Sequence, residues 1–252
     1  MGSGTYVDLH VKILDERVVA RAKRYGLDIL VYAPHFTRLP TIRKRARAYS
    51  DDELLVVPAR ELFTGTWHNR QHVLALGLDR PIPDFTTLAG AMAELKAQNA
   101  VALAPHPEFL TVGLGEAAIS QYREPIAAVE TYNPKHWAHH NRRAREIAAD
   151  LGLPAFGSSY AHRHATVGEV WAKFERSIDT EAELLAALRE GASRRVGHRN
   201  GLLHLWRRRA EFAHLGYENS LKKFDRVVLS GMESTHPQHP AYDGRFENVE
   251  VY

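Results

Sequence analysis

The sequence predicts an α/β protein built as one closed or nearly closed β/α barrel. Short apolar segments alternate with amphipathic segments along the first two thirds of the chain, an order typical of parallel strands joined by helices. About seven such units are present, and single β/α barrels commonly have a length near the 252 residues of this chain. An open doubly wound sheet is disfavoured because residues 8–12 (DLHVK) stand where its glycine-rich phosphate loop would follow the first strand.

The predicted strands are short segments rich in Val, Leu, Ile and Ala, too short to be independent helices. They are residues 6–9, 29–33, 54–59, 72–76, 101–104, 126–131 and 154–158. Amphipathic patterns predict helices at residues 15–25, 85–99 and 141–151. In the first of these helices Val18 and Ala22 share one face, and Gly26 follows as a stop signal.

The chain changes character after residue 190. The remaining residues are rich in Arg, His and aromatic side chains, with a helix predicted at residues 202–215 and a loop rich in Pro and His at residues 234–245. We therefore predict a barrel over residues 1–190 and a basic C-terminal extension, residues 191–252, that packs on the barrel and is not a second domain.

Composition excludes several classes of protein. The chain has no cysteine, so disulfides and thiolate metal sites are excluded, and a metal must be held by His, Asp, Glu or water. No apolar run approaches the roughly 20 residues that cross a bilayer, and the N-terminus lacks a signal-peptide core. These features predict a cytoplasmic protein without a membrane partner, and they leave the oligomeric state open.

Imidazole and carboxylate side chains recur where the predicted strands end. In parallel β/α barrels the active site is built from the loops at the C-terminal ends of the strands. Nitrogen and oxygen ligands that converge there suit Zn, Mn or Fe and leave a position for water. A single histidine at a strand end is more often structural, and the recurrence at successive strands is what predicts a metal centre. The residues are His10, His35, Glu61, His72, His106 and His162.

The motifs around these residues resemble those of the PHP (polymerase and histidinol phosphatase) family of metal-dependent phosphoesterases. Residues 8–12 (DLHVK) resemble the opening D-L-H-x-H of the family, and residues 106–107 (HP) its H-P motif. Residues 129–133 (VETYN) are similar to the E-x-Y-N strand, and residues 158–162 (SSYAH) to G-S-D-A-H. The order holds over residues 6–174. The resemblance implies a distorted (β/α)7 barrel of TIM-like form and a hydrolase.

Three ligand-type residues of the family pattern are replaced. Lys12 stands for the second His of the opening motif, Pro34 for an Asp, and Tyr160 for the Asp of the last motif. By resemblance, one metal position would combine His10 and Glu61 with two of the replaced residues. We expect this position to be empty, with the Lys12 ammonium near Glu61 supplying positive charge in place of a metal.

A second metal position of the family survives. It would use Glu61, His72 and His106, and two imidazoles with one carboxylate form a known catalytic zinc set that leaves a site for water. A third position keeps only His35 and His162. We therefore predict one divalent transition metal per chain (Zn, Mn or Fe), or none.

The hydrolase hypothesis gives each remaining residue a role. Imidazole titrates near neutral pH, so histidines near the metal would bind phosphate or transfer protons together with Lys12. The predicted catalytic residues are His10, Lys12, His35 and His162. The predicted contacts to a phosphorylated small molecule come from Arg60, Arg38 and Asn133.

The alternative is a catalytically inactive PHP-fold protein that binds RNA or DNA. Loss of three ligand-type residues is compatible with loss of catalysis, and Trp206 and Tyr217 offer stacking surface beside basic residues. One basic cluster comprises Arg38, Arg43, Lys44, Arg45 and Arg47. The other comprises Arg194, Arg195, Arg199, Arg207, Arg208 and Arg209. A basic face joining both clusters would favour this hypothesis over the hydrolase.

Overall fold

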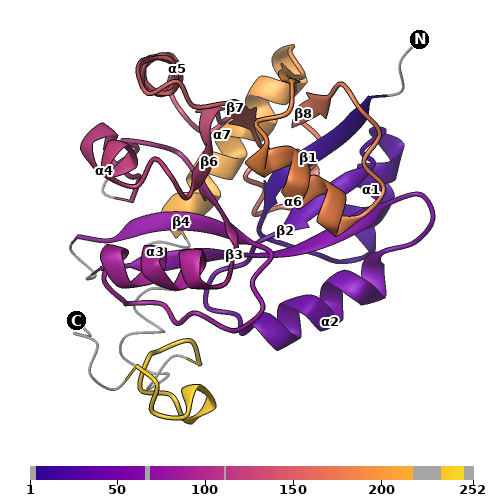
Figure 1. Cartoon of the computed structure of the whole chain (residues 1–252). Helices are drawn as coiled ribbons and strands as arrows, with labels where there is room; N and C mark the ends of the chain where they lie inside the picture. The colour runs from indigo at the N-terminus through magenta and orange to yellow at the C-terminus, as the bar shows by residue number, and fades with distance from the viewer. Residues whose placement is uncertain (1–3, 66–68, 111, 218–233, 247–252) are drawn as a thin grey trace.

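A computed structural model describes residues 4–65, 69–110, 112–217 and 234–246, without the side chains of residues 215–217, so the ring of Tyr217 lies outside the described part. Its strands form one nine-stranded sheet in the order β7-β6-β5-β4-β3-β2-β1-β8-β9 (Figure 1). The strands are β1 (Thr5–Val11), β2 (Ile29–Tyr32), β3 (Leu55–Thr64), β4 (Gln71–Leu76), β5 (Val101–Ala104), β6 (Ile126–Tyr132), β7 (Ala155–Gly157), β8 (Val170–Phe174) and β9 (Arg194–His198).

All seven strands predicted from the sequence are present, as β1 to β7, and two further strands complete the sheet. In β8 the residues alternate between buried and half-buried, a pattern that marks a strand. The side chains of β9 are half-buried or exposed, and its sequence RRVGH lacks an apolar signature. The sheet thus continues past residue 190, where we had predicted that the barrel ends.

The sheet is mixed, whereas the sequence predicted parallel strands. β4 runs antiparallel to both β3 and β5, and β8 runs antiparallel to β1 and β9. Only residues 65–70 join β3 to β4, and a parallel connection needs a dozen or more residues. As a result the beginning of β4 lies beside the end of β3, with His72 opposite Phe63. His72 therefore reaches the same edge of the sheet as residues that follow parallel strands.

The two ends of the sheet approach each other and nearly close the barrel. Arg194 on β9 donates from Nε to the carbonyl oxygen of Ala155 on β7 at 2.8 Å. A Cβ atom on Gly157 would lie 2.5 Å from Cγ1 of Val196 and 3.0 Å from Cγ1 of Val170. Only glycine fits between the two ends. The fold is therefore the distorted TIM-like barrel that the sequence predicted.

Helices surround the sheet and bury its outer face (Figure 1). Four of them correspond to predicted helices, namely α1, α3, α5 and α7, and the basic residues 43–47 fall on a further helix, α2. None of the described helices is long and apolar enough to cross a membrane. The helices are α1 (Glu16–Arg24), α2 (Leu39–Tyr49), α3 (Leu88–Ala97), α4 (Glu116–Gln121), α5 (Ala138–Asp150), α6 (Glu181–Arg189) and α7 (Leu202–Tyr217).

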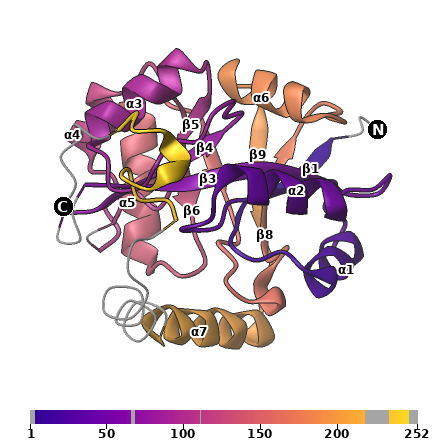
Figure 2. The same ribbon diagram turned by 90° about the horizontal axis from the view of Figure 1, so that it is seen from below.

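Helix α7 lies along one side of the barrel near the beginning of β8 (Figure 2). The buried carboxylate of Glu169 just before β8 holds it there, pairing with His204 and, at 3.0 Å, with Arg207. The same carboxylate pairs with Arg21 on α1 at 2.8 Å. The described part of the C-terminal segment contacts the barrel through the backbone of Thr235, whose oxygen accepts from the N–H of Asp84 at 2.9 Å. Both segments therefore contact the barrel directly.

Candidate metal centre

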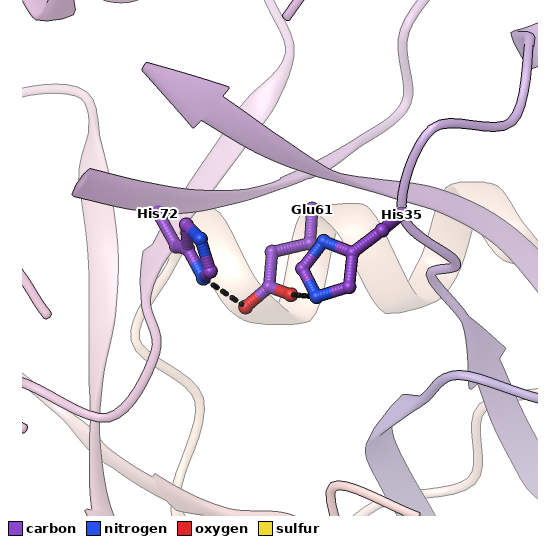
Figure 3. A group of neighbouring side chains, drawn as sticks. All are labelled: His35, Glu61 and His72. Atoms are coloured by element: carbon purple, nitrogen blue, oxygen red, sulfur yellow. Dashed lines mark ion pairs between the residues drawn. The ribbon is translucent and has the colours of Figure 1, made fainter. Parts of the chain in front are cut away.

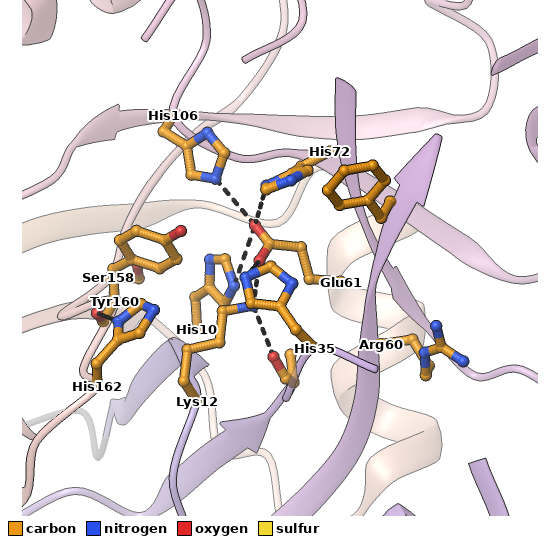
Figure 4. A network of polar contacts seen from close by, with 12 residues as sticks. His10, Lys12, His35, Arg60, Glu61, His72, His106, Ser158, Tyr160 and His162 are labelled. Atoms are coloured by element: carbon orange, nitrogen blue, oxygen red, sulfur yellow. Dashed lines mark hydrogen bonds and ion pairs between the residues drawn. The ribbon is translucent and has the colours of Figure 1, made fainter. Parts of the chain in front are cut away.

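The carboxylate of Glu61 is the centre of a buried polar cluster (Figure 4). Three imidazole nitrogens face its Oε1 atom: Nε2 of His106 at 2.9 Å, Nδ1 of His72 at 3.3 Å and Nε2 of His10 at 3.5 Å. They come from the loop after β5, from β4 and from β1, so the barrel edge collects them from distant parts of the chain.

The other oxygen of Glu61, Oε2, faces two different partners. The Lys12 ammonium pairs with it and also donates to the carbonyl oxygen of Ala33 at 2.7 Å. Nε2 of His35 lies 2.9 Å from the same oxygen. Figure 3 shows the imidazoles of His35 and His72 on either side of the carboxylate. The Lys12 ammonium therefore lies against Glu61, as the sequence hypothesis requires.

Charge and burial oppose each other at this cluster. Burial alone would raise the pKa of Glu61, but the Lys12 ammonium and the surrounding imidazoles hold it well below its usual value. Burial lowers the pKa of Lys12 to about 8, against the pull of Glu61. Burial, with the nearby Lys12 charge, also lowers the pKa of His10 to about 3 and that of His35 well below its usual value. Both imidazoles are thus neutral at pH 7.

A buried glutamate fixes His106 in place. His106 has a positive φ of 32°, in the left-handed region that costs a non-glycine residue about 1 kcal/mol or more. Its N–H donates to Oε2 of Glu130 at 2.7 Å, and the Ser158 hydroxyl donates to Oε1 at 2.5 Å. Burial raises the pKa of Glu130. Glu130, in the E-x-Y-N motif, therefore orients the loop and does not face the cluster as a ligand.

A second buried carboxylate, Asp8 of the opening motif, fixes the loop that follows β7. It accepts from the N–H of Ser159 at 3.0 Å and from that of Gly168 at 3.3 Å. Burial raises the pKa of Asp8 to about 6. These bonds tie β1 to the loop in which Tyr160 replaces the aspartate of the family pattern.

Tyr160 fills space beside His10. Its φ is 46°, its side chain is buried, and its ring centroid lies 4.8 Å from that of His10 and 5.1 Å from that of His106. The Lys12 ammonium lies 5.6 Å from the same ring centroid. A phenol ring and an ammonium thus stand on the side of Glu61 where the resemblance implied a metal position.

The opposite side of Glu61 fits a metal ion. Ligands of a tetrahedral zinc, each about 2 Å from the ion, lie about 3.3 Å apart. Nδ1 of His72 lies 3.3 Å from Oε1 of Glu61, and Nε2 of His106 lies 2.9 Å from the same oxygen. No described residue hydrogen-bonds either ring nitrogen of His10 or His72. Ligand atoms of His35, Glu61 and His72 also fall within 4.8 Å of one another. Among the described residues this is the group whose ligand atoms lie that close to one another. The set predicted from the sequence shares Glu61 and His72 with it and has His106 in place of His35.

The three residues predicted to bind substrate have other partners in the structure or are exposed. Arg60 lies on the opposite face of β3 from Glu61, because successive residues of a strand alternate, and it pairs with buried Asp84 at 2.7 Å (Figure 4). Asn133 is buried and donates from Nδ2 to Glu130 at 3.1 Å. Arg38 is exposed at the N-cap of α2.

Other residues at the site escaped the sequence analysis. Lys135 and Glu211 are buried next to His162, and Arg70 lies with its guanidinium 5.8 Å from the centroid of the Phe63 ring. Burial lowers the pKa of Arg70, and the nearby Tyr160 phenol opposes this effect. A lysine and a glutamate outside the strand ends carry no local signal of burial. Arg70 stands two residues before His72 and could have been considered with it.

Comparison with known proteins supports the same family. Residues 138–193 match the PHP-associated family model, PHP_C. No curated protein matches the chain. The crystal structure of PsfC from Pseudomonas syringae PB-5123 is similar with a TM-score of 0.62 and 21% identity, covering 87% of this chain and 99% of that protein.

Two further similar structures are named after activities. Endonuclease Q, in complex with a 27-mer duplex carrying an abasic lesion, gives a TM-score of 0.59 and 15% identity over 76% of this chain and 58% of that one. A putative metal-dependent phosphoesterase from Bifidobacterium adolescentis gives 0.51 and 14%, over 63% and 88%. At these identities the similarity establishes the fold. The PHP-associated match, which is confined to residues 138–193, and the motif order support a PHP-family domain.

Proposed function

We propose that the chain is a metal-dependent phosphoester hydrolase with one divalent transition metal, held by Glu61, His72 and His106. The observation that carries the proposal is that the buried imidazole nitrogens of His72 and His106 lie 3.3 Å and 2.9 Å from Oε1 of Glu61, close enough for the three groups to share one ion. The PHP-family domain and the phosphoesterase among the structures of the same fold support this reaction class.

The reduced number of metals is part of the proposal. Lys12 supplies positive charge at Oε2 of Glu61, and the ring of Tyr160 occupies space beside His10. A lysine is a compact point charge with three donors, so it can contact a phosphoryl oxygen as a metal does, without coordination geometry. The predicted metal position built on His10 would therefore stay empty.

The catalytic roles follow from the positions of the side chains. When bound, a metal of this type polarises a phosphoryl oxygen and lowers the pKa of water toward about 7. His35, partly exposed beside Glu61, is placed to orient the attacking water through a hydrogen bond. The Lys12 ammonium stabilises negative charge that develops on the phosphoryl group. Arg70 at the cluster replaces Arg60 as the proposed phosphate contact.

Nucleic-acid binding remains the alternative, and the positions of the arginines favour the hydrolase. Several guanidinium groups of the second basic cluster are used inside the fold: Arg194 bonds the Ala155 carbonyl, Arg207 pairs with Glu169, and Arg199 bonds the Gly168 carbonyl at 3.3 Å. Such groups are less available to a polynucleotide. We therefore propose a phosphorylated small molecule as the substrate class.

Metal content tests the proposal. Protein purified without chelator is analysed by plasma mass spectrometry as wild type, His72→Ala, His106→Ala and the exposed control His139→Ala. We expect about one transition metal per chain in wild type and control, and loss in both other variants. Wild type without metal, even after incubation with zinc or manganese, would overturn the hydrolase mechanism and favour assays of RNA and DNA binding.

Replacement of Lys12 tests the reduced site. Lys12→His restores the family ligand and removes the ammonium, so metal content should rise above that of wild type. Unchanged stoichiometry in this variant would contradict the role of Lys12 as a substitute for a metal.

A further inference from the structure

A second cluster of buried polar residues lies beside the Glu61 cluster. It consists of Lys135 after β6, Tyr160 and His162 after β7, and Glu211 on α7. Lys135 is 3% exposed, His162 8% and Glu211 1%. Figure 4 shows His162 next to Tyr160, on the side of the cluster formed by His10 and Lys12.

The hydrogen bonds of Lys135 determine which nitrogen of His162 carries the proton. Nζ of Lys135 lies 2.6 Å from Nδ1 of His162 and also bonds the carbonyl oxygen of Tyr160. An ammonium donates and cannot accept, so Nδ1 must accept from it. The proton of the neutral imidazole is then on Nε2. The Tyr160 carbonyl, 3.0 Å from Nδ1, would favour the opposite tautomer if Lys135 were absent.

Charge balance keeps the ammonium in this buried place. Oε1 of Glu211 lies 3.5 Å from Nζ of Lys135, and it accepts from the N–H of His162 at 2.5 Å and of Arg163 at 3.1 Å. A buried charge persists where it is paired and hydrogen-bonded. Helix α7 thus supplies the counter-charge for Lys135 and holds the backbone of the loop that carries His162.

We propose that Lys135 is a positioning residue that holds His162 as the Nε2–H tautomer, so that His162 donates a hydrogen bond to an anionic phosphoryl oxygen and does not coordinate a metal. A protonated ring nitrogen has no lone pair for a metal ion, so the third metal position of the family pattern is absent here. The assignment of the acceptor as a phosphoryl oxygen rests on the proposed function. The assignment of the tautomer is independent of the proposed function.

Nitrogen NMR of the histidine rings tests the tautomer without any activity. Metal-free protein is labelled with ring-¹⁵N histidine, and His162→Gln assigns the His162 signals. We expect an unprotonated Nδ1 and a protonated Nε2 in wild type, and the reverse in Lys135→Met, where the Tyr160 carbonyl becomes the acceptor. Lys135→Gln, which keeps an N–H donor, should retain the wild-type tautomer. A protonated Nδ1 in the wild type overturns the inference, whether or not the variants fold.

Two titrations separate this inference from the proposed function. Zinc should shift the ring signals of His72 and His106 and leave Nε2 of His162 protonated. A zinc-induced shift of the His162 Nε2 signal would contradict the inference.

Inorganic phosphate should perturb the Nε2–H signal of His162 and bind about tenfold more weakly to Lys135→Met, the effect of losing one hydrogen bond to a charged group. If zinc shifts no histidine signal while His162 has the expected tautomer, the proposed metal site is refuted and the role of Lys135 is not. An unperturbed Nε2–H would overturn the assignment of the acceptor.

Discussion

Replacing Lys12 with Met removes the ammonium that pairs with Glu61. In the structure the side chain of Lys12 is 4% exposed and that of Glu61 0%, and the Lys12 ammonium also donates to the Ala33 carbonyl oxygen at 2.7 Å. Met has a similar length and no charge. The variant therefore leaves the buried Glu61 carboxylate without its ammonium partner and leaves a buried carbonyl oxygen without this donor.

The expected loss follows from the burial of the pair. Removing one partner of a buried ion pair costs about 3–5 kcal/mol, because the remaining charge stays in the interior. The measurement belongs at pH 7, below the pKa of about 8 of Lys12 and above that of about 3 of His10, so that the wild-type pair is charged and the imidazole neutral. Glu61→Gln should also destabilise, and the double variant should lose at least about 1 kcal/mol less than the sum of the single variants.

Urea unfolding of metal-free protein, followed by tryptophan fluorescence, measures these differences. A loss below about 1 kcal/mol in Lys12→Met would refute the reasoning, since that is the range of exposed ion pairs. Zinc provides a second check. At one hundred times its dissociation constant a ligand stabilises by about 2.7 kcal/mol, and we expect zinc to stabilise Lys12→Met more than wild type because the position beside Glu61 is then open to a cation.

Two further predictions concern pH and barrel closure. Burial lowers the pKa of His10 to about 3 and of His136 to about 2, so the unfolded chain takes up protons first. As the pH decreases from about 6.5, the free energy of unfolding should therefore decrease by about 1.4 kcal/mol per pH unit for each histidine. Asp8, whose pKa is raised to about 6, offsets part of this loss because the folded chain binds its proton first. Equal urea midpoints at pH 7.5 and 5.5 would contradict this. Gly157→Ala places a Cβ 2.5 Å from Val196 and should cost about 1–3 kcal/mol in the same assay, whereas a neutral effect would mean that the barrel ends are further apart.

Local patterns made much of the fold predictable. The predicted strands overlap β1 to β7 because burial and strand length leave a signal within a few residues, although β3 extends to Thr64 and not only to residue 59, so that Glu61 lies within it. β9 was missed because its residues are only partly buried, so selection for apolar side chains is weak there. The mixed direction of the sheet was missed as well, although the short connection at residues 65–70 contained the information.

The candidate site was predictable only as a set of residue types. His10, His72 and His106 could be proposed around Glu61 because each stands at a strand end, and the structure brings their nitrogens to one carboxylate oxygen. Arg60 could not be excluded by its position next to Glu61, since the direction of a side chain depends on which face of β3 meets the barrel interior.

The sequence by itself determined which ligand-type residues this protein has and which it lacks, including the lysine and tyrosine at positions 12 and 160. Only the tertiary structure decided which of them meet. Lys135 and Glu211 lie 76 residues apart in the chain and come together through the packing of α7 on the barrel, a contact with no local signature. Hydrogen bonds and ion pairs act over a few ångströms, so the tautomer of His162 is a property of the folded chain.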